Sequence, residues 1–167
     1  STYMRGIPFI NIPTSLLAMV DASVGGKTGV DLGALKNLVG VINNPKGVLI
    51  YPDFLATLPT EELRSGMAEM FKHGLISDEG YWHKMCNLSE LTEAHLGSLI
   101  YESVVIKNEV VTQDPTEKGL RKTLNYGHTL GHAIESYCLQ NPNRERLLHG
   151  EAIAIGMVLA TYLSVKE

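Results

Sequence analysis

The first third of the chain and the remainder carry different patterns of hydrophobic and polar residues. Before position 52, short apolar runs are separated by glycine-rich or polar breaks, which predicts strands and turns. Residues 7–12 predict a strand, and the Val- and Ile-rich pieces at 38–51, with an Asn-Asn-Pro break between them, predict a hairpin. Between them a short helix is expected at 16–20, with Thr14 or Ser15 as its cap.

From Pro59 onward, apolar residues recur every three or four positions, which predicts helices. The expected helices cover residues 60–76, 78–87, 95–112, 122–138 and 150–163. Thr60 is expected to cap the first of them, and Asp114-Pro115 ends the third. The last is apolar on nearly every side, so it should be buried. The change of pattern at 52–59 marks the boundary between a short α/β piece and a helical piece.

Composition narrows the class of protein. The 167 residues are 44% hydrophobic and 19% charged, which is typical of a globular protein. The net charge of −4 argues against nucleic-acid binding, which relies on a basic surface. Two cysteines cannot make a disulfide framework, so a reducing, cytoplasmic compartment is expected. No apolar run reaches the roughly 18–20 residues of a membrane span, so no membrane association is expected.

Two histidines four residues apart are the strongest chemical feature. His128 and His132 share one face if residues 122–138 are helical, and this spacing suits two imidazoles on one metal ion. Gly127 and Gly131 are costly inside a helix and need a reason, such as the close approach of another helix or a ligand. The alternative is a pair of hydrogen-bonded histidines in a glycine-lined packing seam.

Two further residues could complete a metal site. His149 opens the last helix, where a neutral, metal-bound imidazole suits the helix dipole better than a charged one; a surface histidine is the alternative. Glu69 lies off the apolar stripe of its helix, with Lys72 three residues on. An exposed ion pair is the commoner explanation of that spacing. The other is a carboxylate ligand beside a substrate-binding ammonium, since two histidines and one glutamate form a common catalytic zinc site.

Several cations could bind an anion. The sequence Gly25-Gly26-Lys27-Thr28 resembles the end of a P-loop, but the full pattern needs a glycine where Asp21 stands, so that interpretation fails. The loop can still offer backbone N–H groups and Lys27 to an anion. Each remaining candidate is a surface charge if taken alone, but convergence would make a receptor for a small polyanion. These candidates are Lys36 with Asn37, Lys72, Lys107 and Arg121.

Taken together, the motifs resemble the 3-dehydroquinate synthase family of the sugar-phosphate cyclase superfamily. The matching segments follow the family's order and cover nearly the whole chain. They are PTSLLAMVDASVGGKTGV at 13–30, KNLVG at 36–40, TLP at 57–59, GMAEMFK at 66–72, GLR at 119–121, LNYGHTLGHAIE at 124–135 and HGEA at 149–152. One departure is Ala22, where the family often has serine.

The resemblance implies a fold that is mostly α with a small α/β part. Residues 1–58 would be the end of an N-terminal α/β NAD-binding domain, and residues 59–167 most of a helical metal- and substrate-binding domain. The chain lacks an initiator Met, and the family's glycine-rich dinucleotide segment would precede residue 1. The family's last helices would follow residue 167. The chain is therefore expected to be a fragment that is inactive alone.

The resemblance also implies roles for individual residues. Glu69, His128 and His149 match the zinc ligands, whereas His132 matches a residue that faces the substrate phosphate and handles a proton, which overrules the pairing of His128 with His132. Substrate-contacting positions are Asp21, Lys27, Lys72, Lys107, Arg121 and Asn125, with Asn37 at the phosphate. Positions at the nicotinamide dinucleotide are Thr14, Ser15, Lys27, Lys36, Phe54, Thr57, Leu58 and Glu62.

The activity implied by the resemblance is that of an NAD- and metal-dependent carbon–oxygen lyase of the shikimate pathway. The family converts 3-deoxy-D-arabino-heptulosonate 7-phosphate to 3-dehydroquinate and phosphate, using NAD and Zn²⁺ or Co²⁺. NAD transiently oxidises the C5 alcohol, which acidifies the neighbouring C–H and allows phosphate to leave. The expected partners are this phosphorylated sugar acid and a second copy in a homodimer. The alternatives are another sugar-phosphate cyclase, a metal-dependent alcohol dehydrogenase, or a non-catalytic helical module.

Overall fold

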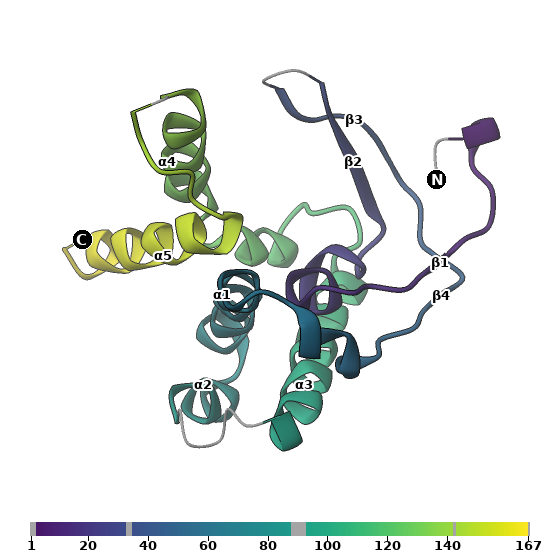
Figure 1. Ribbon diagram of the computed structural model, residues 1–167, viewed down its shortest axis with the longest axis horizontal. Helices are drawn as coiled ribbons and strands as arrows, with labels where there is room; N and C mark the ends of the chain where they lie inside the picture. Colours follow the sequence, from purple (N-terminus) through teal and green to yellow (C-terminus); the bar gives the residue numbers. More distant parts are fainter. Residues whose placement is uncertain (1–2, 33–34, 88–92, 142, 167) are drawn as a thin grey trace.

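The computed structural model describes residues 3–32, 35–87, 93–141 and 143–166. Five α-helices make up half of this part of the chain, and two small two-stranded sheets lie to one side of them (Figure 1). This arrangement confirms the expected class, mostly α with a small sheet-containing part. Among the described residues, no helix combines the length and the apolarity needed to cross a membrane.

The helices follow the apolar periodicity closely. Their bounds are Thr60–Ser77 for α1, Glu79–Cys86 for α2, Glu93–Gln113 for α3, His128–Gln140 for α4 and His149–Lys166 for α5. The stop at Asp114-Pro115 is confirmed, because α3 ends at the preceding residue. The cap expected at Thr60 is wrong: Pro59 occupies the cap position and no side chain bonds there.

The single helix expected over 122–138 is two elements. A 3₁₀ segment, η5 (Leu120–Asn125), is followed by α4, and Gly127 between them has φ of +79°. A residue with a side chain is strained at that angle. A Cβ on Gly127 would also lie only 2.7 Å from the backbone nitrogen of Met157. The glycine therefore breaks the helix and lets α5 approach, rather than sitting inside a helix as the sequence suggested.

The strands pair differently from the expected hairpin at 38–51. Strand β3 (Leu35–Ile42) pairs in antiparallel register with the strand before it, β2 (Lys27–Leu32). This hairpin stands away from the helices (Figure 1). Strand β4 (Gly47–Val48) pairs in parallel with β1 (Ile10–Asn11), which is shorter than the strand expected at 7–12. The Asn-Asn-Pro break is thus a connection between two sheets, anchored by the amide of Asn43 on the carbonyl of Gly26 at 2.8 Å.

The main core joins the N-terminal segment to the first three helices. The short helix expected at 16–20 continues into a π-helical turn, η2 (Ala18–Ala22), and Ser15 caps it by accepting the amide of Ala18 at 3.4 Å. The buried cluster of η2 and the helices consists of Leu16, Met19, Val20, Met70, Tyr81, Met85, Leu99, Ile100 and Ile106. Because Met19 and Val20 anchor η2 against α1 and α3, the next residue, Asp21, is held beside those helices.

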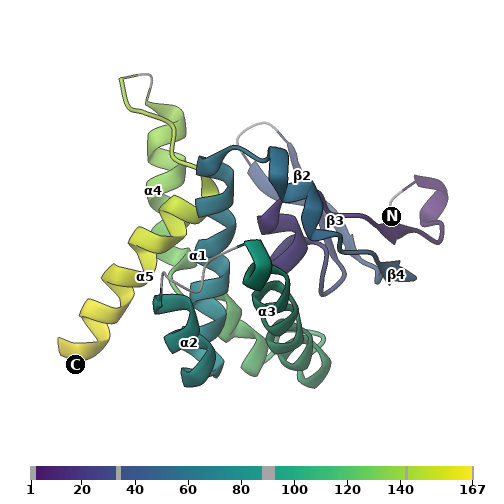
Figure 2. The ribbon, with the colours of Figure 1, turned by 60° about the horizontal axis from the view of Figure 1, so that its bottom comes forward.

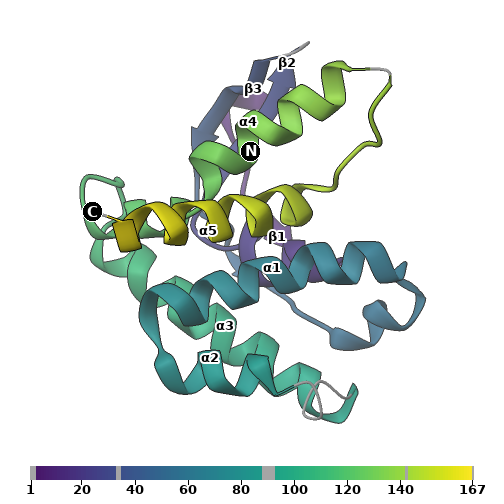
Figure 3. The same cartoon turned by 90° about the vertical axis from the view of Figure 1, so that its left-hand side faces the viewer.

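Helix α5 packs against α1 and α4 through one face only (Figures 2 and 3). That face contains Gly150, Ala152, Ile153, Gly156 and Met157, which are buried. The expectation of a helix buried all round is wrong for the described chain, because its other side is exposed. The exposed apolar residues there include Val158, Tyr162, Leu163 and Val165.

The expected division at 58/59 falls just after η3 (Pro52–Thr57), a 3₁₀ segment that leads from β4 into α1. The core crosses this position, because η2 packs on α1 and α3. The two-domain division stays a prediction.

Candidate metal centre

Glu69 is carried into the interior by helix α1. Its side chain is fully buried and that of Lys72 is 1% exposed, and the two groups form an ion pair. The exposed ion pair that the spacing favoured is therefore wrong. Burial follows from the close approach of α5, whose Gly150 lies so near the backbone of Ser65 that any side chain would collide with it. The amide of Gly150 also donates to Ser65 Oγ at 2.9 Å.

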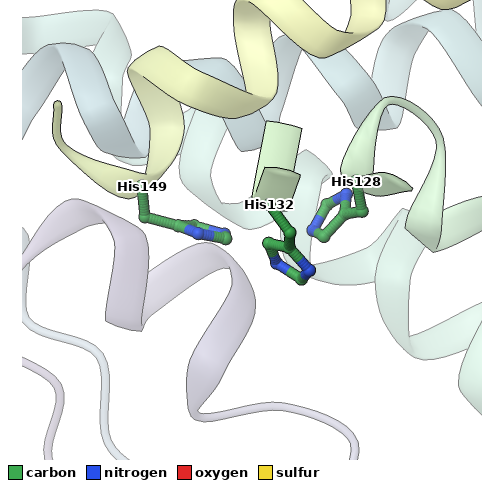
Figure 4. A group of neighbouring side chains, drawn as sticks. All are labelled: His128, His132 and His149. Carbon is green, nitrogen blue, oxygen red and sulfur yellow. The ribbon is translucent and has the colours of Figure 1, made fainter. Parts of the chain in front are cut away.

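Three histidines meet beside this carboxylate. His128 and His132 come from the first turns of α4, and His149 is the first residue of α5. Their rings gather side by side (Figure 4), with centroids 5.2 Å apart for His128 and His132 and 5.6 Å for each pair with His149. One ring nitrogen of each lies within 4.8 Å of the others.

Glu69 completes the cluster. Its Oε1 lies 3.8 Å from Nε2 of His128 and 3.9 Å from Nε2 of His149, and this oxygen is buried without a hydrogen-bond partner. Ligands about 2.0–2.1 Å from one tetrahedral ion lie roughly 3.3–3.5 Å apart. A small shift of these side chains would therefore let Glu69, His128 and His149 share a divalent ion. His132 lies near the same point, so proximity alone does not separate it from the other two histidines.

Electrostatics also suit a cation at this point. Burial, helped by the nearby Asp21, raises the pKa of the Glu69 carboxyl, and the Lys72 ammonium only partly offsets this. A carboxylate held in this way gains from a positive ion facing its unpaired oxygen. Burial also lowers the pKa of His128 to about 4, so its imidazole is neutral at pH 7 and has a lone pair to offer.

A second group of charges lies between η2, α1 and α3. Asp21 Oδ1 is 2.6 Å from Nζ of Lys107 and 4.0 Å from Nζ of Lys72, and both lysines are buried. Burial alone would raise the pKa of Asp21, but the two ammonium groups outweigh it and hold the pKa well below its ordinary value. The carboxylate is therefore ionised and keeps both cations in place.

Glu117, in the loop after α3, contacts two further residues that the sequence analysis selected, Lys27 and Asn125. Lys27 forms an ion pair with Glu117, and Asn125 Nδ2 donates to the other oxygen of Glu117 at 2.6 Å. Arg121 is 3% exposed and donates to the carbonyl oxygens of Gly25 at 2.8 Å and of Pro115 at 3.0 Å. Arg121 thus ties the glycine-rich turn to this loop, so its guanidinium has a structural task besides the expected substrate contact.

These groups surround a cavity of about 440 Å³. That volume is within the range of small-molecule sites. Seven of the residues selected from the sequence line it: Asp21, Lys27, Lys72, Lys107, Arg121, Asn125 and His128. Four of the seven are cations, so the cavity suits a small polyanion.

Of the expected dinucleotide contacts, Lys27 lines this cavity and six others lie outside it. Ser15 caps η2, Phe54 packs edge-on against Tyr51, and Thr57 ends η3. With Thr14, Leu58 and Glu62, none of them lines the cavity. Lys36 and Asn37 lie on β3, but their side chains are outside the part that the structure describes.

Three functional candidates escaped the sequence reasoning. Glu117 contacts both Lys27 and Asn125, and it lies in a loop where apolar periodicity gives no signal; its φ is +58°. His73 is fully buried, with Nδ1 2.7 Å from Ser103 Oγ and a burial-lowered pKa of about 3. His73 follows Glu69 by four residues, and this spacing could have indicated that the two side chains share one face of the helix. Glu135 lies near His149 and was visible only as the end of the LNYGHTLGHAIE motif.

The chain is similar to known proteins of one family along its whole length. Two family models, described as 3-dehydroquinate synthase N-terminal and 3-dehydroquinate synthase C-terminal, match residues 1–65 and 66–167. The 3-dehydroquinate synthase of Streptococcus sanguinis is 45% identical over 170 residues, which is 100% of this chain and 47% of that protein. The enzyme of Prochlorococcus marinus is 49% identical over 173 residues, 100% of this chain and 46% of that protein. The chain spans about half the length of the curated relatives it matches.

The fold is also similar to that of solved enzyme structures. The 2-epi-5-epi-valiolone synthase of Streptomyces hygroscopicus, with NAD⁺ and Zn²⁺ bound, has a TM-score of 0.78 and 34% identity over 99% of this chain and 47% of that one. A 2-deoxy-scyllo-inosose synthase complexed with carbaglucose-6-phosphate, NAD⁺ and Co²⁺ has a TM-score of 0.81 and 32% identity. The match covers 98% of this chain and 46% of that one.

Proposed function

The chain belongs to the 3-dehydroquinate synthase family, and from that premise we propose that it forms the metal- and substrate-binding part of such an enzyme. The reaction is the conversion of 3-deoxy-D-arabino-heptulosonate 7-phosphate to 3-dehydroquinate and phosphate in the shikimate pathway. The observation that carries the proposal is the unpaired buried oxygen of Glu69, which faces His128 and His149 at the edge of a cation-lined cavity.

Glu69, His128 and His149 are the proposed ligands of Zn²⁺ or Co²⁺, the ions present in the two solved relatives. The donor set fits, since one buried carboxylate oxygen and two imidazole nitrogens converge from three helical positions. When bound, the ion supplies Lewis acidity toward the substrate hydroxyls. Helices α1, α4 and α5 contribute rigidity, because backbone contacts at glycines fix their spacing.

The cations of the cavity bind and orient the substrate, which carries a phosphate and a carboxylate. Lys72 and Lys107 are held in fixed positions by Asp21, so they lose little side-chain freedom on binding. Lys27 and Asn125 are proposed phosphate contacts, and both bind a shared partner, Glu117. Asn37, on β3, is the further proposed phosphate contact.

His132 is the proposed residue that faces the phosphate and handles a proton. Support comes from its place among the other two histidines, one helical turn after His128. An imidazole there can accept a proton near the reacting carbon and return it. Arg121 contributes by keeping the glycine-rich turn against the loop that carries Glu117.

NAD is the proposed hydride acceptor, and NAD⁺ is bound in the two solved relatives. The chain's own residues fit one side of a dinucleotide site: Thr14 is exposed, and Phe54 is 42% exposed beside η3. Lys36, Thr57, Leu58 and Glu62 are the other proposed contacts. A homodimer remains a prediction.

The test is an assay of phosphate release from the heptulosonate phosphate in the presence of NAD⁺ and Zn²⁺, using the full-length protein. Glu69→Gln and His128→Ala should each lower kcat/KM by at least 100-fold and reduce bound zinc. His83→Ala is the matched control, because that histidine is 71% exposed and should change neither. Turnover of a non-acidic sedoheptulose phosphate without turnover of the heptulosonate phosphate would assign the protein to another cyclase of the superfamily.

A further inference from the structure

Glu135 lies on α4 at the position that shares a face with both histidines of that helix. It follows His128 by seven residues and His132 by three, so all three side chains leave α4 on the side that meets α5. The residue it reaches on α5 is His149. Oε2 of Glu135 is 3.5 Å from Nδ1 of His149.

The His149 ring therefore lies between two carboxylates. Nδ1 faces Glu135, and Nε2 faces Oε1 of Glu69 at 3.9 Å. The side chain of Glu135 is 13% exposed and its Oε2 is buried. A carboxylate oxygen in such a place is stabilised by an N–H donor, and the nearby ring nitrogen can provide one.

We propose that Glu135 is a positioning residue for the metal centre: it accepts the Nδ1–H of His149 and thereby leaves the Nε2 lone pair facing Glu69 and His128. The proposal rests on the proposed metal site. A histidine that binds a metal through one ring nitrogen commonly donates its other N–H to a carboxylate, which fixes both the tautomer and the ring orientation. Without that acceptor, His149 can carry its proton on Nε2 and cannot bind the ion in that form.

The packing of the two helices does not depend on this contact. Helices α4 and α5 approach through glycines: a Cβ on Gly131 would lie 2.9 Å from the carbonyl oxygen of Ala152, and one on Gly156 would lie 2.7 Å from the nitrogen of Gly131. Substituting Glu135 should therefore act on the His149 ring and leave the helix pair in place. This separates a positioning role from a purely structural one.

The experiment measures the dissociation constant of Zn²⁺ by competition with a chromophoric chelator, in the full-length protein and three variants. Glu135→Leu should weaken zinc binding about 10- to 100-fold, the range seen when such supporting contacts are lost. Glu135→Gln keeps a carbonyl acceptor and should recover part of that loss. Glu102→Gln is the matched control: it removes a carboxylate paired with Lys84 on the α2–α3 side and should leave zinc affinity unchanged.

A second readout follows the tautomer itself. In the zinc-loaded parent protein, ¹⁵N NMR of labelled histidine should show His149 protonated at Nδ1, with that proton protected from exchange. In Glu135→Gln the same proton should exchange faster, while far-ultraviolet circular dichroism shows an unchanged helix content. This measurement keeps the test available if Glu135→Leu fails to fold.

Two outcomes would overturn the proposal. One is a folded Glu135→Leu or Glu135→Gln protein that binds zinc as tightly as the parent; the other is His149 protonated at Nε2 in the loaded protein. If zinc binding still depends on Glu69 and His128 in those cases, the proposed function stands and only the role of Glu135 falls. A parent protein that binds no zinc would instead overturn the proposed metal site, and this proposal with it.

Discussion

Helix α5 approaches α4 so closely that Gly156 should tolerate no side chain. A Cβ built at Gly156 collides with the carbonyl oxygen of Gly127 and lies 2.7 Å from the backbone nitrogen of Gly131. Both obstacles are backbone atoms, so no side-chain rotation can relieve the contact. We therefore expect Gly156→Ala to push α5 away from the start of α4.

The magnitude follows from two opposing effects. At an exposed position inside a helix, replacing glycine by alanine stabilises the folded protein by about 1 kcal/mol. At Gly156 the added Cβ would collide with the Gly127 oxygen, so the two atoms need to separate by roughly 1.5 Å or more to regain ordinary contact at about 3.5–4.0 Å. Overpacking of a close-packed interior typically costs about 1–3 kcal/mol, so the net effect should be destabilising by that order. Because His149 and His128 begin the two helices, zinc affinity should fall as well.

Thermal unfolding and chelator competition test this directly. For a protein of this size, the expected loss lowers Tm by roughly 2–4 °C per kcal/mol. Gly97→Ala in α3 is the matched control, since its Cβ would meet only Pro52 Cγ at 3.8 Å; there Tm should rise slightly. An equal or higher Tm for Gly156→Ala, with zinc binding intact, would refute the argument that glycine contacts set the spacing of the metal ligands.

Three further predictions concern other buried contacts. Burial lowers the pKa of His73 to about 3 in the folded state, against an ordinary 6.5. The unfolded chain therefore binds a proton that the folded chain does not, and the free energy of unfolding should fall as the pH drops below about 6.5. His73→Phe should reduce the slope of unfolding free energy against pH in that range by about 1 kcal/mol per pH unit, as measured by denaturant titration. Glu117→Ala should raise KM for the phosphorylated substrate several-fold, because Lys27 and Asn125 lose their common partner; an unchanged KM contradicts this. Ser65→Ala should cost about 1–2 kcal/mol in urea unfolding, since the buried amide at the start of α5 loses its acceptor.

The helical half of the chain could be predicted well because helix periodicity is a local property. The stripe along α1, the short α2 and the end of α3 before Pro115 each depend on residues within a few turns of one another. The break at Gly127 could not be predicted from local periodicity, because it depends on a contact with a distant part of the chain. Its left-handed φ and the approach of α5 are set by a residue 30 positions away, Met157.

Strand pairing was less accessible to sequence reasoning. The apolar pieces at 27–32 and 38–51 are all compatible with strands, and nothing local says which pair forms. The structure pairs β3 with β2 and β4 with β1, so the apparent hairpin is divided between two sheets. The β1–β4 pairing joins segments more than 30 residues apart, and periodicity does not encode such a contact.

By itself, the amino-acid sequence determined the helices, the residue types of a carboxylate–imidazole metal site and, through its motifs, the family. Only the tertiary structure decided that Glu69 is buried rather than exposed, and that its free oxygen faces two histidines some 60 and 80 positions later. The physical reason is that a side chain's burial and charge environment depend on what packs against it. Here that is α5, held against α1 and α4 by glycines whose missing side chains have no effect until the helices meet.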